Sequence, residues 1–181
     1  MFRRVLFTVI ALGFASATAL SEVVNVSSGG FLLKHEADVK AEPAVLYETL
    51  TAGVAGWWNP AHTYSGDARN LSIAAVPGGC FCEKLPGGGV LHMTVVYAAP
   101  GKALRMTGAL GPLQGSGLAG SLTWNLAKIE GGTRIVLTYG VGGYMPGGLE
   151  KVAPLADAML GEQLQRLKSF AETGSPIPAP K

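Results

Sequence analysis

The sequence predicts an α+β fold in which an antiparallel sheet carries helices on one face. Three observations lead to this prediction. An alternating strand and a short helical segment come first, six β-like runs separated mostly by Gly-rich or Pro-Gly turns follow, and a long amphipathic segment comes last. Closely spaced strands with short turns indicate an antiparallel meander. Helices on one face of such a sheet are the simplest way to bury both patterns.

The N-terminal residues 1–19 have the three-part pattern of a secretory signal peptide. Arg3 and Arg4 precede a short apolar run, and Ala17-Thr18-Ala19 fits the cleavage site. The apolar run is short for a membrane span. We therefore expect a periplasmic or secreted protein with no membrane span after signal cleavage, in which residues 20–29 form a linker.

The composition favours one apolar domain over a nucleic-acid-binding protein. The chain has 181 residues, of which 14% are charged and 48% hydrophobic, and a net charge of +2. This length predicts a single domain, placed at residues 30–172. The absence of a basic cluster with interleaved aromatic residues argues against nucleic acid as a partner. So few charges indicate a large core, a cavity, or both, and the Pro-rich residues 173–181 are predicted to be disordered.

The elements follow in a clear order along the chain. Residues 31–39 alternate apolar and polar side chains, as a half-buried strand does. A short helix is predicted to begin at Pro43, because proline suits the first helical turn. A polar loop follows the helical segment. The β-like runs are residues 71–76, 79–84, 90–98, 102–110, 120–129 and 133–141.

The last segment, residues 147–171, has the apolar stripe of a long helix that begins near Pro154. At ~1.5 Å per residue it is long enough to cross a whole sheet. The stripe contains small residues where a packed core would favour bulk, which predicts a pocket bordered by this helix together with Trp124 and Tyr139. The residues on or near the stripe include Ala153, Ala156, Met159, Leu160, Gly161, Gln163, Leu164 and Leu167.

Several stretches resemble the SRPBCC superfamily, which has the START-like, helix-grip fold. They include "EPAVLYETLTAGVAGWW", "PGGCFCE", "GGTRIVLTYGVGGY" and "LADAMLGEQLQRLKSF". The likeness is greatest to bacterial heat-shock-protein ATPase activator homologues and polyketide-cyclase-like proteins. It implies a curved antiparallel sheet wrapped around the C-terminal helix, with a deep cavity between them. Members bind lipids, hormones, polyketides or aromatic compounds, and some are enzymes.

The two cysteines of the chain, Cys80 and Cys82, are one residue apart on one predicted strand. In an extended strand their Cα atoms lie ~6.6 Å apart, so a disulfide would need a bulge or a break. We therefore expect two packed thiols, with a disulfide or a metal site as alternatives. A three-residue turn would place His92 opposite Cys82, and a four-residue turn would place it opposite Glu83. In the first register, Cys80, Cys82 and His92 form a weak metal motif without a fourth ligand.

The candidate ligand-binding residues lie on predicted inward faces or at the cavity entrance. They are His35, Trp58, His62, His92, Trp124, Tyr139, Met159 and Gln163. Core packing is the alternative for His35, Trp58, Trp124 and Tyr139, and a hydrogen bond to a backbone carbonyl is the alternative for Gln163. No nucleophile elbow, zinc-protease motif or phosphate-binding glycine loop is present, so no cofactor and no specific catalytic residue is predicted.

These observations favour a module that binds a small apolar or amphipathic molecule between the sheet and the long helix. The first alternative is a cyclase- or hydrolase-type enzyme that uses His35 or His92 as acid or base. The second alternative is a protein-interaction module of the heat-shock ATPase activator type. The ligand, the reaction and the oligomeric state are left open by the sequence.

Overall fold

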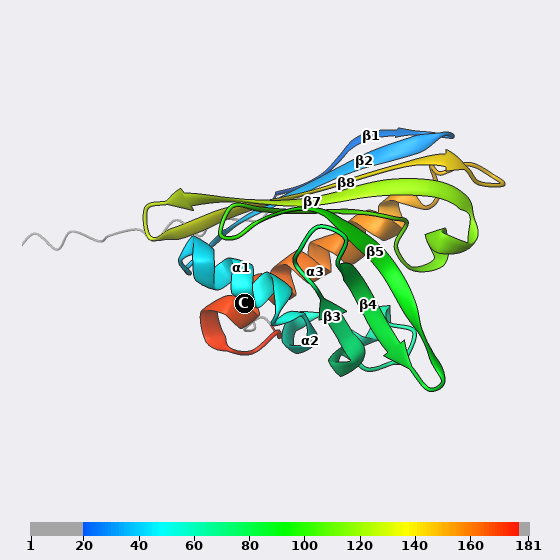
Figure 1. Cartoon of the computed structure of the whole chain (residues 1–181). Helices are drawn as coiled ribbons and strands as arrows, with labels where there is room; N and C mark the ends of the chain where they lie inside the picture. The colour runs from blue at the N-terminus through cyan, green and yellow to red at the C-terminus, as the bar shows by residue number, and fades with distance from the viewer. Residues whose placement is uncertain (1–19, 178–181) are drawn as a thin grey trace, which may run out of the picture.

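The computed structural model describes residues 20–177 and confirms the predicted α+β architecture (Figure 1). The strands form one antiparallel sheet in the order β1-β2-β8-β7-β6-β5-β4-β3. They are β1 (Leu20–Ser27), β2 (Gly30–Val39), β3 (Leu71–Ile73), β4 (Cys80–Leu85), β5 (Gly88–Ala99), β6 (Ala103–Thr107), β7 (Gly117–Ile129) and β8 (Gly132–Tyr144). The helices are α1 (Pro43–Thr51), α2 (Val54–Trp57) and α3 (Ala153–Thr173), with the 3-10 turns η1 (Pro60–His62), η2 (Ala68–Asn70) and η3 (Gly111–Gly115).

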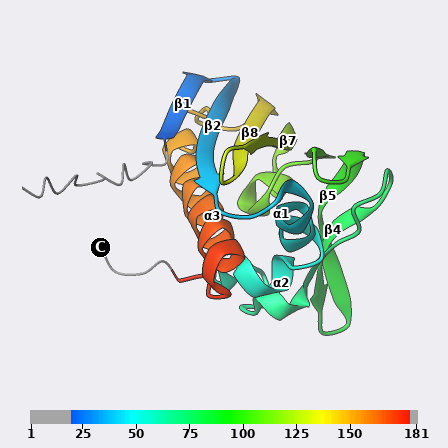
Figure 2. The same ribbon diagram turned by 90° about the vertical axis from the view of Figure 1, so that its left-hand side faces the viewer.

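The long helix α3 lies in the concavity of the curved sheet, as Figures 1 and 2 show from two sides. It carries a proline in its first turn, as predicted, and ends at Gly174, which has φ +76°. The inward residues of β2, β7 and β8 pack beneath it as the alternation predicts. Trp57 of α2 meets Trp124 of β7 in a T-shaped contact that ties the short helices into the same core.

Two bulges on β5 contribute to the bend of the sheet. The pairing with β4 skips His92, and the pairing with β6 skips Val96. A bulge adds one residue to one strand, and the strand bends and twists there. In Figure 1 the strands β5, β4 and β3 turn away from the plane of β7 and β8 and close around one side of α3.

Residues 20–29 are not the linker that the sequence predicts. Residues 20–27 form β1, which pairs antiparallel with β2 along the edge of the sheet. A register shift between Val23 and Asn25 interrupts the alternation of this strand, and that interruption hid it from a period-two reading. The valines of β1 are exposed. The strand is therefore held to the sheet mainly by its backbone hydrogen bonds to β2.

The chain ends fit the predicted boundaries only in part. The described part of the tail, residues 174–177, does not run free, because the Ser169 hydroxyl donates a hydrogen bond to the Ile177 carbonyl. The predicted signal peptide, residues 1–19, lies outside the described residues. Among residues 20–177, no helix combines the length and the apolar character needed to cross a membrane.

Candidate functional site

A pocket of about 620 Å³, called here the inner pocket, lies between the first half of α3 and the bent part of the sheet. The loop after α2 and the turn η3 form its other walls. Its lining residues are Trp58, Ala61, His62, Thr63, Tyr64, Phe81, His92, Leu110, Gly111, Pro112, Leu113, Tyr139, Met145, Val152, Leu155, Ala156 and Met159.

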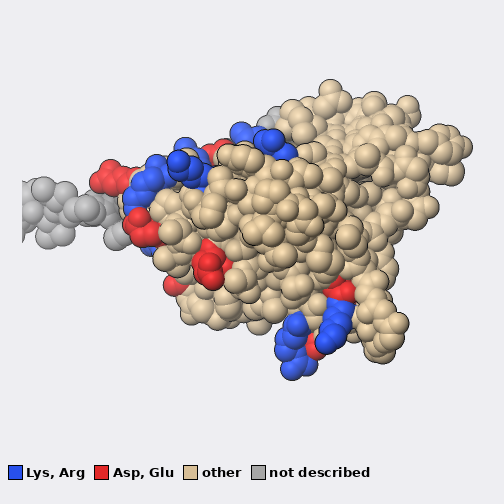
Figure 3. Space-filling model, in the orientation of Figure 1, with Lys and Arg blue, Asp and Glu red and all other residues tan. Residues whose placement is uncertain are grey.

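The lining of the inner pocket is uncharged and largely apolar. It contains no Asp, Glu, Lys or Arg. Leu155 is 71% exposed and Tyr64 is 53% exposed, so these large side chains mark the rim. Figure 3 shows a related pattern on one face of the molecule, where charged side chains gather at one end and at the lower tip and leave a broad uncharged surface between them.

Hydrogen bonds fasten the walls of the pocket to one another. The Tyr64 hydroxyl donates to the Gly111 carbonyl over 3.0 Å and links the loop after α2 to η3. The Gln114 amide donates to the carbonyls of Leu91 and His92 at the β5 bulge. The turn η3 therefore holds both the loop after α2 and the β5 bulge.

A buried carboxylate orients the histidine of the pocket. The Glu83 side chain is fully buried, and its Oε2 lies 3.0 Å from Nε2 of His92. The same carboxylate accepts hydrogen bonds from the backbone N–H groups of Tyr64 and Ser65. Because a buried charge needs such partners, the loop after α2 and the β5 bulge are both built around Glu83. Phe81 and Tyr64 flank the imidazole, with ring centroids 4.9 and 5.9 Å away.

The charge states of this pair follow from its surroundings. Burial raises the pKa of Glu83, but the hydrogen bonds from Ser65, Tyr64 and His92 outweigh that effect and hold it below its usual value. Burial lowers the pKa of His92, although the hydrogen bond and charge of Glu83 oppose the shift. At neutral pH the pair is therefore a carboxylate and a neutral imidazole. An ionised carboxylate can only accept, so Nε2 of His92 carries the proton and Nδ1 is the acceptor.

The buried histidines should make the protein less stable in acid. Burial lowers the pKa of both His35 and His92, so below about pH 6.5 the unfolded chain binds protons that the folded chain does not. The unfolding free energy should then be highest above that pH and fall as the pH drops through the folded pKa values. The lowered pKa of Glu83 adds a further loss in stronger acid.

Urea denaturation between pH 8 and pH 5 measures this dependence. A His92→Phe variant should show a shallower decrease than the parent protein, because one of the two groups no longer titrates. A stability that stays constant or rises on acidification would contradict the prediction.

The structure brings five of the eight predicted ligand-binding residues to the inner pocket. They are Trp58, His62, His92, Tyr139 and Met159. His35, Trp124 and Gln163 are buried but do not line it. Trp124 packs in the core against Trp57. Trp124 points inward from β7, as the alternation predicts, but the core around Trp57 fills that part of the concavity.

His35 and Gln163 tie α3 to its neighbours. Nε2 of His35 lies 2.9 Å from Oδ1 of Asp157, a distance at which the two form an ion pair when the ring is protonated. The ring of His35 also lies under Gly161, where an added Cβ would come within 3.1 Å of it. Oε1 of Gln163 accepts the backbone N–H of Asn59. Gln163 therefore anchors the loop after α2, and His35 anchors β2.

The prediction of two free thiols is wrong, because Cys80 and Cys82 form a disulfide. Their Cα atoms are 5.4 Å apart, closer than an undistorted strand allows. The register shift of the hairpin, between Phe81 and Cys82, supplies the bulge that such a bridge needs. The disulfide also removes both thiolates from the candidate metal set with His92. Among the described residues no cluster of His, Cys, Asp or Glu could hold a metal ion.

The register of the hairpin matches neither predicted turn in full. Pro86 and Gly87 make a two-residue turn, and Gly87 has φ +74° as its second turn residue. Cys80 pairs with Thr94, as the three-residue alternative predicts, but Cys82 pairs with Leu91. The extra residue in β5 is His92, whose side chain turns inward to Glu83.

Because the disulfide closes a very short loop, its loss should cost little. Bridging positions 80 and 82 encloses three residues, and the chain-entropy relation gives about 1.5 kcal/mol for a loop of that size. A Cys80→Ser/Cys82→Ser variant should lose about that much unfolding free energy in denaturant. Thiol counting on denatured, non-reduced parent protein should find no free thiol, and two free thiols would contradict the bridge.

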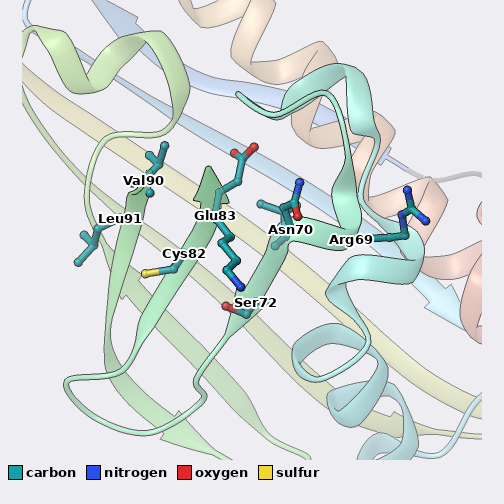
Figure 4. Close-up of a pocket in the computed structure, with 11 residues that line it drawn as sticks. Arg69, Asn70, Ser72, Cys82, Glu83, Val90 and Leu91 are labelled. Atoms are coloured by element: carbon teal, nitrogen blue, oxygen red, sulfur yellow. The ribbon is translucent and has the colours of Figure 1, made fainter. Parts of the chain in front are cut away.

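A second hollow, of about 720 Å³, lies over the strands β3 to β5 (Figure 4). Most of its lining residues are exposed, among them Arg69, Ser72, Lys84 and Leu91, so it is a surface depression. In Figure 4 the side chains of Cys82 and Glu83 leave β4 in different directions. The disulfide therefore belongs to the outer surface, and Glu83 reaches toward the interior.

The sequence places Glu83 opposite His92 in one of the two predicted registers but does not mark it as a site residue, and the η3 residues of the pocket were missed. Glu83 occupies a buried position on β4, and the signal that could have marked it is an acidic residue on the same strand face as Phe81 and Leu85. Leu110 and Leu113 belong to the glycine-rich residues 108–120, which carry no helical or alternating apolar pattern. They are buried because the backbone N–H of Leu110 donates to the Tyr139 hydroxyl and so holds η3 against β8.

Solved structures share this fold over most of the chain. A conserved protein of unknown function from Enterococcus faecalis matches with a TM-score of 0.60 and 18% identity, over 88% of this chain and 80% of that one. The Aha1 dimer from Colwellia psychrerythraea matches with a TM-score of 0.58 and 23% identity, over 79% and 97%. CalU16 from Micromonospora echinospora matches with a TM-score of 0.55 and 11% identity, over 87% and 88%.

These likenesses confirm the helix-grip, START-like fold that the sequence predicts. No protein-family model matches the chain, and no curated protein matches it significantly. At identities this low the likeness extends to the fold alone, so function has to be argued from the site.

Proposed function

We propose that this protein binds a small, uncharged and largely apolar molecule in the inner pocket. The observation that carries the proposal is the lining, which combines apolar walls from α3, η3 and β4 with no charged side chain. Its volume of about 620 Å³ lies in the range of small-molecule sites. A neutral lining of this kind disfavours an ionic ligand, because the ligand's charge would lose its hydration without gaining a partner.

Binding of Nile red, a neutral apolar dye, tests the proposal directly. Its fluorescence should rise on addition of the folded protein and return to the free value in denaturant. A native mass spectrum of protein from its host should show an added small-molecule mass. An empty monomer that leaves Nile red unchanged would contradict ligand binding and would favour an interaction module.

An acid–base enzyme is the second candidate, and the Glu83–His92 pair is the observation that favours it. A neutral histidine oriented by a buried carboxylate can accept a proton near neutral pH. His35, the other histidine considered for this role, does not line the pocket. If the parent protein converts a bound compound and the His92→Phe variant does not, the protein is an enzyme that uses this histidine.

We also propose that the protein is exported. Residues 1–19 have the pattern of a signal peptide, and a structural disulfide such as Cys80–Cys82 persists in oxidising compartments. The first strand starts at Leu20, so cleavage after Ala19 would leave every described element intact. N-terminal sequencing of the protein from its native host should begin near Leu20, and a protein that still starts at Met1 would refute export.

A further inference from the structure

The polar side chains that line the inner pocket are mostly engaged within the protein. The Trp58 indole N–H donates to the His62 carbonyl, and the Thr63 hydroxyl donates to the Pro60 carbonyl. The Tyr64 hydroxyl donates to Gly111. Groups that are already paired gain little from a ligand, because a new hydrogen bond must replace an existing one.

Two further polar groups differ in what they can offer. His62 lies at the rim, where its side chain is 37% exposed and its Nε2 contacts Glu162. The Tyr139 hydroxyl oxygen accepts the N–H of Leu110, and burial raises the pKa of this phenol to about 12, so it stays protonated. Tyr139 is therefore able to donate a proton but is poorly placed to accept one.

The imidazole of His92 supplies a stronger acceptor than the hydroxyl oxygens of Thr63 and Tyr64. Its Nε2 is bound to Glu83, which leaves the lone pair of Nδ1 as the acceptor of the ring. Within residues 20–177 no group hydrogen-bonds to Nδ1, and Nδ1 is not one of the fully enclosed polar atoms that lack a partner. Because His92 lines the pocket, this lone pair is available to a bound molecule.

We infer that the inner pocket selects apolar molecules that carry one hydroxyl group, of the phenol class, whose proton is accepted by Nδ1 of His92. The inference rests on the proposed function, since it concerns the same pocket. Glu83 acts here as a positioning residue, because it fixes the tautomer that makes Nδ1 an acceptor. The surrounding apolar walls, including Phe81, Leu113 and Met159, contact the rest of such a molecule.

Displacement of Nile red by two matched competitors tests this inference. 4-Phenylphenol carries the hydroxyl, and 4-methoxybiphenyl has the same skeleton with that hydroxyl methylated. The parent protein should prefer 4-phenylphenol about tenfold, the contribution of one hydrogen bond in a desolvated site. His92→Phe keeps an aromatic ring at the position and should bind Nile red but lose the preference.

A spectroscopic measurement checks the tautomer without any ligand. The ¹⁵N resonances of His92 should show the proton on Nε2 in the parent protein. In Glu83→Gln the amide N–H can donate to Nε2 and shift the proton to Nδ1, which should abolish the preference for the phenol. This readout distinguishes positioning of the ring from a general loss of packing.

The outcomes separate the two proposals. If Nile red does not bind the parent protein, the proposed function fails and the present inference fails with it. If Nile red binds but both biphenyls compete equally, only the selectivity for a hydroxyl is overturned. A preference that persists in His92→Phe, or a parent His92 with its proton on Nδ1, also overturns it.

Discussion

Replacing Glu83 by alanine should lower the unfolding free energy by about 3 kcal/mol or more, because three donors lose the carboxylate that accepts from them. The carboxylate is fully buried and accepts from Tyr64, Ser65 and His92. Its removal leaves two backbone N–H groups and one imidazole N–H without an acceptor, and each unsatisfied group costs ~1–3 kcal/mol. Urea denaturation at pH 7 measures the loss.

Glu130→Ala is the matched control for this prediction. Glu130 is exposed in the turn between β7 and β8, and an exposed substitution of this kind changes stability within about ±0.5 kcal/mol. The loop after α2 should also loosen in Glu83→Ala, and faster amide exchange at Tyr64 and Ser65 would report it. A Glu83→Ala protein as stable as the Glu130→Ala control would show that Glu83 is not a central support of the pocket.

The elements of the fold were predictable because they depend on local patterns. The alternation of residues 31–39 puts Phe31, Leu33 and His35 on the buried face of β2, as expected. The apolar stripe of the last segment predicts the helix α3, and Pro154 predicts its first residue to within one position. Period-two and period-3.6 patterns survive in these elements because each buries one face against the other.

The site was less predictable, because it depends on interruptions of those patterns. The bulge at His92 shifts the hairpin by one residue, brings His92 to Glu83 and lets Cys80 reach Cys82. A single residue of register decides which face each side chain occupies, and sequence periodicity does not specify it. The same interruption explains both the wrong expectation for the thiols and the missed role of Glu83.

The sequence also does not predict whether an inward-facing side chain contacts the packed core or lines the pocket. Trp124 and Tyr139 both point inward from neighbouring strands, and the sequence treats them alike. Trp124 meets Trp57 in the core, whereas Tyr139 reaches η3 through Leu110 and lines the pocket. Which of two inward residues meets an open space depends on how far the short helices fill the concavity, and that is a property of the whole chain.

Replacing Ala156 by tryptophan should abolish binding of Nile red while changing stability by little. Ala156 lies on α3 and lines the inner pocket with only its methyl group. An indole at this position would occupy space that the pocket leaves open, so it would exclude a ligand without displacing core side chains. We expect the Kd for Nile red to rise at least tenfold, which corresponds to about 1.4 kcal/mol of binding free energy.

Ala158→Trp on the same helix is the matched control, because Ala158 is exposed and does not line the pocket. The control should bind Nile red as the parent protein does, which separates the filling of the pocket from the presence of a tryptophan on α3. The opposite pattern is equally informative. If Ala156→Trp is destabilised by the ~1–3 kcal/mol typical of an overpacked core and the parent binds no dye, the space beside Ala156 closes in solution. The concave face of the sheet would then serve packing around α3 and not ligand binding.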